Sequence, residues 1–115
     1  MRINLIVLRT KNIDELSGFY EKLGIRFEYH RHGNGPAHYS AVLEETVFEI
    51  YPLQKNQEKP DDSLRLGFGV EALDALILKL KSDNIVIENG PVESEWGYFA
   101  VVKDLDGRRI ELKEI

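Results

Sequence analysis

An internal repeat constrains the fold of this chain more than any other feature of its sequence. Gly24 and Asn84 lie 60 positions apart, and each separates an amphipathic segment from a segment of alternating apolar residues. Glycine and asparagine are the residues that most readily adopt the left-handed conformation that ends a helix. Because each copy of such a repeat is one structural unit, the sequence predicts a fold built from two similar modules.

Each copy contains one predicted helix. The first begins with Asn12 and has Glu15 three residues later, which is a capping-box arrangement. Apolar residues then recur every three or four positions in both segments, as a helix with one buried face requires. These residues are Ile13, Leu16, Phe19, Tyr20 and Leu23 in the first copy, and Leu73, Leu76, Ile77 and Leu80 in the second.

Predicted strands surround each helix in the same order. We expect a strand before the helix at residues 3–9 and 64–70, and another after it at residues 25–28 and 85–88. Two hairpins follow, with strands 37–43 and 46–52 in the first copy and 97–103 and 108–113 in the second. Each module is therefore βαβββ. Module 1 covers 1–53, a polar linker with two prolines covers 54–62, and module 2 covers 63–115.

Composition narrows the functional classes. The 115 residues include no cysteine, which excludes disulfides and cysteine zinc sites. The formal net charge of −5 comes without a basic stripe, so nucleic acid is not an expected partner. No apolar run approaches the length of a membrane span, and no signal peptide is visible, so we expect a cytoplasmic protein without membrane contact.

Two motifs are similar to those of a known family. Residues 12–24 contain Phe19-Tyr20 followed by Leu23-Gly24, and Trp96-Gly97 is followed by an Asp-Leu-Asp-Gly turn and a Glu-Leu strand. Together with the duplication, they resemble the vicinal oxygen chelate superfamily, which contains glyoxalase I, bleomycin-resistance proteins and extradiol dioxygenases. The resemblance implies an α+β fold in which two tandem βαβββ modules form a curved, cup-like mixed sheet with helices on the outer face. It covers nearly the whole chain.

The resemblance also implies where a metal would bind. Transferred residue by residue, the superfamily's ligand positions are Leu5, Glu49, Arg65 and Glu111. Leucine cannot coordinate a metal, and arginine stays protonated and has no lone pair to offer. Two carboxylates remain, which can hold a hard divalent cation only weakly. We therefore expect no metal cofactor, with a divalent metal on Glu49 and Glu111 as the alternative.

Arg65 suggests a second hypothesis. If it points into the cup, its planar guanidinium can bridge Glu49 and Glu111, so that a cation of the protein replaces the metal. The alternative is that one or more of these side chains faces water, where ion pairs contribute little. The two possibilities differ in how strongly Arg65→Ala would destabilise the protein.

Further residues are candidates for ligand contact. If Glu49 and Glu111 face the cup, strand alternation places Tyr51 and Arg109 on the same faces. Trp96 and Tyr98 can stack on a planar ligand or serve as core or interface anchors. His30 and His32 share one face and precede a turn, with His38 after it. Such a cluster can bind metal or act as a general base, but we expect solvent-exposed histidines, with His38 the best placed to reach a pocket.

Two functional classes remain open. The first is metal-independent binding or sequestration of a small molecule in the cup. The excess of acidic residues in the chain favours a cationic ligand. The second is a metal-dependent lyase, isomerase or dioxygenase with an altered ligand set, in which Glu49 or Glu111 serves as the catalytic base. The resemblance also implies a homodimer, since short members of the superfamily usually associate.

Overall fold

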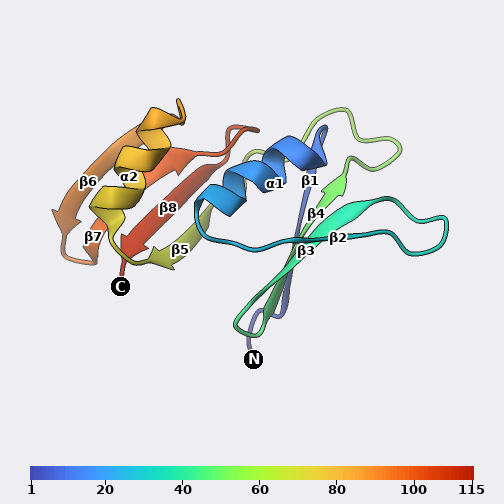
Figure 1. The fold of residues 1–115 in the computed structure, drawn as a ribbon, viewed down its shortest axis with the longest axis horizontal. Helices are drawn as coiled ribbons and strands as arrows, with labels where there is room; N and C mark the ends of the chain where they lie inside the picture. Colours follow the sequence, from blue (N-terminus) through green and yellow to red (C-terminus); the bar gives the residue numbers. More distant parts are fainter. The chain divides into compact units, whose positions relative to one another are not determined.

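The computed structural model describes all residues from 1 to 115, and they form two compact units, Met1–Asp61 and Asp62–Ile115. Figure 1 labels the elements. In module 1 they are β1 (Leu5–Thr10), α1 (Ile13–Lys22), β2 (Glu28–His30), β3 (His38–Leu43) and β4 (Thr46–Pro52). In module 2 they are β5 (Leu66–Val70), α2 (Leu73–Ser82), β6 (Ile87–Ser94), β7 (Gly97–Lys103) and β8 (Arg109–Glu114).

Both modules have the same sheet topology. The strand order is β1-β4-β3-β2 in module 1 and β5-β8-β7-β6 in module 2. In each sheet the first and last strands of the module pair in parallel, and the remaining pairs are antiparallel. The α+β class and the tandem βαβββ organisation are therefore confirmed, and each module forms its own four-stranded mixed sheet.

One face of each sheet is covered by the module's own helix, and this interface holds the core (Figure 1). Strand alternation predicted which side chains would point there. Phe48 and Ile50 of β4 are fully buried, as are Ile110 and Leu112 of β8. The helices contribute the other half of the core, from Leu16, Phe19 and Tyr20 in α1 and from Leu73, Ile77 and Leu80 in α2.

The three helix caps predicted from the sequence are present. Gly24 and Asn84 both have positive φ angles, of 107° and 62°, directly after the helices. The side chain of Asn12 accepts a hydrogen bond from the backbone N–H of Glu15 at 3.0 Å. The start of α2 has no such cap, and the N–H of Leu73 instead donates to Oε1 of Glu114, at the end of β8, at 3.0 Å. Neither helix is long and apolar enough to cross a membrane.

Only β4 and β7 have the predicted bounds, and β2 and β6 differ most from theirs. β2 begins at Glu28, where the predicted strand 25–28 ends. β6 continues to Ser94 through Gly90 and Pro91, which interrupt the alternating pattern. Proline is tolerated because β6 is an edge strand with register irregularities at this point, so no regular ladder bond depends on its missing N–H.

Candidate functional site

The face of each sheet that does not carry the helix, called here the far face, holds both predicted carboxylates. On β4, Val47, Glu49 and Tyr51 alternate with the buried Phe48 and Ile50. In module 2, a Cβ built on Gly67 would lie 3.4 Å from Oε2 of Glu111, so Glu111 lies on the same face as the missing side chain of Gly67. The predicted orientation of both acids is thus consistent with the register of each sheet.

The residues beside the carboxylates do not fit a metal at the superfamily's ligand positions. Glu49 pairs with Val7 of β1, and Leu5 pairs with Val47. Glu111 pairs with Gly67, and Arg65 is exposed and precedes β5. Aliphatic side chains and glycine offer no lone pair, and a guanidinium repels a dication. Each module therefore supplies a single carboxylate at these positions.

Module 1 places two rings beside Glu49 and an arginine against one of those rings. His38, at the start of β3, is 3% exposed, and its ring stacks on Tyr51 with centroids 4.2 Å apart and planes at 7°. Its Nε2 lies 3.8 Å from Oε2 of Glu49, whose side chain is 18% exposed. Arg9, which sequence reasoning did not single out, lies 5.2 Å from the Tyr51 centroid and donates to the carbonyl of Pro52 at 3.1 Å.

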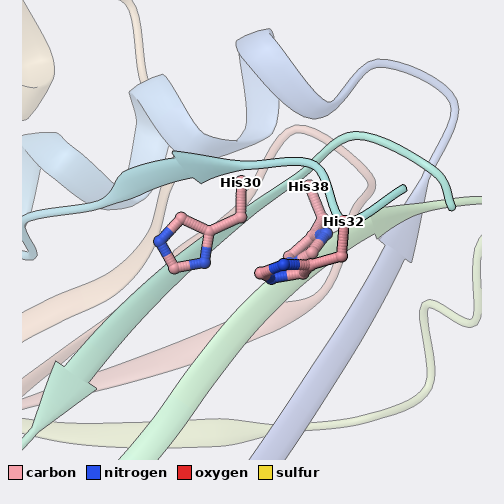
Figure 2. Close-up of side chains that lie close together, drawn as sticks. All are labelled: His30, His32 and His38. Atoms are coloured by element: carbon pink, nitrogen blue, oxygen red, sulfur yellow. The ribbon is translucent and has the colours of Figure 1, made fainter. Parts of the chain in front are cut away.

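All three histidines of the chain gather beside this group, at one end of the β2–β3 hairpin (Figure 2). One ligand atom from each lies within 4.8 Å of the other two. His38 is buried, His30 is half-buried and His32 is exposed. The general expectation of solvent-exposed histidines holds fully only for His32. His38, the histidine expected to be best placed to reach a pocket, is buried because strand pairing carries its ring under Tyr51 and beside Glu49.

The candidate residues of module 2 are more exposed. Trp96 is 73% exposed, in the turn between β6 and β7. Arg109 donates from Nε to Oε1 of Glu88 at 2.8 Å. Their contact with a ligand stays a prediction.

Tyr98 lies on the helix side of its sheet. Its hydroxyl donates to Oδ1 of Asp74 on α2 at 2.6 Å, and this hydrogen bond raises the pKa of Tyr98. Module 1 repeats the contact, because the hydroxyl of Tyr39 donates to Oδ1 of Asp14 on α1, also at 2.6 Å. The role of Tyr98 in ligand contact stays a prediction, while its hydroxyl joins the helix to the sheet.

Sequence reasoning also missed a buried ion pair. Arg108 is 1% exposed and donates from Nη1 to Oδ2 of Asp104 at 3.1 Å and to Oδ2 of Asp106 at 2.9 Å. Burial alone lowers the pKa of Arg108, but the two carboxylates outweigh this effect and raise it. The signal was present in the turn sequence Asp-Leu-Asp-Gly-Arg, where acids two and four residues before an arginine can fold back onto it.

Two βαβββ modules of identical strand order, each with a glutamate of its last strand on the far face, define a class of duplicated α+β proteins. The chain belongs to the Glyoxalase/Bleomycin resistance protein/Dioxygenase superfamily, whose model matches residues 2–112. None of the curated proteins matches the sequence.

Solved structures of similar fold cover almost the whole chain. A glyoxalase family protein from Bacillus cereus aligns with a TM-score of 0.82 at 16% identity, covering 99% of this chain and 93% of its own. TnmS3, an antibiotic binding protein from Streptomyces sp. CB03234, aligns with a TM-score of 0.77 at 21% identity, covering 99% of this chain and 95% of its own. The trypanothione-dependent glyoxalase I of Leishmania major aligns with a TM-score of 0.76 at 23% identity, covering 99% of this chain and 86% of its own. At these identities the likeness concerns the fold.

Proposed function

We propose that this protein binds a small planar organic cation on the far face of module 1, without a metal at the superfamily's ligand positions. The observation that carries the proposal is the environment of Glu49. Its partly exposed carboxylate lies between the aliphatic side chains of β1 and the flat rings of His38 and Tyr51. Apolar and aromatic walls with one charged group are typical of small-molecule sites.

The charge of the protein and its structural relatives support this class of ligand. The formal net charge of −5 attracts cations. The antibiotic binding protein TnmS3 shares the fold over 99% of this chain.

A fluorescence titration with proflavine, a planar cationic acridine, tests the proposal. We expect saturable binding, and Glu49→Gln should weaken it about tenfold, since about 1.4 kcal/mol of charge-assisted interaction is lost. Glu44→Gln removes an exposed acid from the neighbouring β3–β4 turn and should leave the affinity unchanged. An anionic ring system of the same size, anthracene-9-carboxylate, should bind more weakly than proflavine. Equal binding by wild type and Glu49→Gln would exclude this site.

A metal-dependent lyase, isomerase or dioxygenase is the second candidate, in which Glu49 or Glu111 serves as base. The 3.8 Å distance between Nε2 of His38 and Oε2 of Glu49 favours it, because a neighbouring imidazole can receive or return a proton. Assays with a hemithioacetal and with a catechol, each with and without added Mn²⁺, test this function. Turnover that disappears in Glu49→Gln would favour the enzyme over simple binding.

We also infer a homodimer located in the cytoplasm. β1 and β2 end one sheet and β5 and β6 end the other, and unpaired strand edges favour association. Sedimentation at micromolar concentration should give twice the chain mass of 13.2 kDa. A mass of a single chain would contradict the dimer.

A further inference from the structure

The β2–β3 hairpin brings the three histidines together by its geometry. His30 and His38 are directly opposite each other in the antiparallel ladder, so their side chains point to the same face. Between them the chain makes a tight turn, in which the N–H of Gly35 donates to the carbonyl of His32 at 2.9 Å and Gly33 has a φ of 57°. The turn folds His32 back over the cross-strand pair.

The three rings form a nearly equilateral triangle. Their centroids are 5.6 Å apart for His30 and His32 and 5.7 Å apart for the other two pairs. One ligand atom from each histidine lies within 4.8 Å of the others. In a tetrahedral zinc site with Zn–N bonds of about 2.0–2.1 Å, ligating nitrogens are about 3.4 Å apart. Small side-chain rotations are enough to close this difference.

Hydrogen bonds already orient two of the rings. Nδ1 of His38 lies 3.2 Å from the carbonyl of Pro36, which can only accept, so a hydrogen bond here uses Nδ1 and leaves Nε2 as the nitrogen that can bind a metal. Nε2 of His30 lies 3.1 Å from Oε2 of Glu28. That carboxylate leaves Nδ1 of His30 available, and in Figure 2 one nitrogen of this ring lies on the side of the other histidines while the other points away. Metal-binding histidines commonly have such carboxylate and carbonyl partners.

Glu49 lies beside one of the three histidines. Its Oε2 is 3.8 Å from Nε2 of His38, which is almost fully buried. Zinc bonds of about 2.0–2.2 Å to nitrogen and oxygen span this separation.

We propose that His30, His32 and His38 bind a divalent transition metal of the zinc type, with the carboxylate of Glu49 beside His38. Imidazole nitrogen suits Zn²⁺, Ni²⁺, Co²⁺ and Cu²⁺, whereas Mg²⁺ and Ca²⁺ prefer oxygen. The site lies within module 1 and uses three residues outside the superfamily's ligand positions. It does not depend on the proposed function, with which it shares His38 and Glu49.

The composition of the chain leaves a single place where a metal can bind through imidazole. These are its only three histidines, and there is no cysteine. Any metal bound through imidazole must therefore bind at this cluster. The test uses protein without a polyhistidine tag, which would add competing ligands.

Zinc affinity, measured by competition with a chromophoric chelator, tests the site. We expect one equivalent to bind with micromolar or tighter affinity, and His32→Ala to weaken it by about 100-fold, since even outer-shell changes cost about 10- to 100-fold. His32 is exposed, so this variant should keep its fold, as circular dichroism would verify. Asn34→Ala, an exposed change in the same turn, is the matched control and should bind zinc like wild type.

Cobalt provides an independent readout. Co²⁺ in a four-coordinate nitrogen and oxygen site should give strong visible absorption, which His32→Ala should abolish. Absence of zinc binding in wild type, or equal affinity in wild type and His32→Ala, would overturn the proposal. Loss of binding in Glu111→Gln with His32→Ala unaffected would place the metal at the superfamily's ligand positions and also overturn it. Proflavine titration of metal-free protein tests the proposed function separately.

Discussion

Two neighbouring arginines of module 2 show how strongly burial changes the value of a charge. Arg108 is 1% exposed and contacts Asp104, which is completely buried, whereas Arg109 is 53% exposed and contacts Glu88. A buried charge that loses its partner keeps its full desolvation penalty, but an exposed charge returns to water. The same residue type, one position along the chain, therefore has two different roles.

This contrast gives a stability prediction at the residue scale. Arg108→Met should lower the free energy of unfolding by about 3–5 kcal/mol, because it leaves Asp104 buried without its cation. Arg109→Met should lower it by less than about 1 kcal/mol. Urea denaturation of both variants measures the difference. Similar losses in the two variants would show that the Arg108 pair does not stabilise the fold in this way.

At the scale of elements, each helix is joined to its own sheet by a tyrosine. Tyr39 donates to Asp14 on α1, and Tyr98 donates to Asp74 on α2. The hydrogen bond to the aspartate is the main cause that raises the pKa of each phenol, because it requires the neutral form. Repetition of this contact in both modules indicates that it belongs to the basic βαβββ plan.

The direction of these shifts predicts a pH dependence. A phenol whose pKa is higher in the folded state stabilises the protein fully below its unfolded value of about 10, and this contribution is lost as the pH rises through the folded value. The Tyr39→Phe and Tyr98→Phe variants should therefore lose stability at neutral pH and show a smaller further decrease above about pH 10 than wild type. Urea denaturation across this range measures both effects.

Tyrosinate absorbance gives a second measurement. The difference between wild type and each variant should show a tyrosine that ionises above the normal range. Tyr29→Phe removes an exposed tyrosine without a hydrogen bond to a helix and serves as the control. A Tyr98 signal at or below the ordinary pKa would contradict the proposed effect of Asp74.

Local patterns predicted most elements, and long-range contacts account for the rest. β4 and β7 have their predicted bounds because turn residues delimit clear alternating patterns. The cap of α2 was not predictable, since its acceptor, Glu114, is 41 residues from Leu73. The closeness of Glu49 to His38 likewise depends on the pairing of β3 with β4, which spacing along the chain does not specify.

At the scale of the whole molecule, the bridge from Arg65 to Glu49 and Glu111 stays a prediction. If it forms, Arg65→Ala leaves two acids without a cation and should cost about 3 kcal/mol or more of unfolding free energy at neutral pH. Arg26→Ala, at an exposed position of module 1, should change stability by no more than about 0.5 kcal/mol. An Arg65→Ala effect as small as that of Arg26→Ala would mean that Arg65 faces water.

The duplication has a consequence for how such a protein can change over evolutionary time. Both modules keep the strand order and the tyrosine contact, yet all histidines lie in module 1 and the buried arginine lies in module 2. A gene with two copies of one scaffold can accumulate new chemistry in the hairpin of one copy while the other preserves foldability. We expect natural variants to differ most in the turn between His32 and His38 and least along the helix-covered strands.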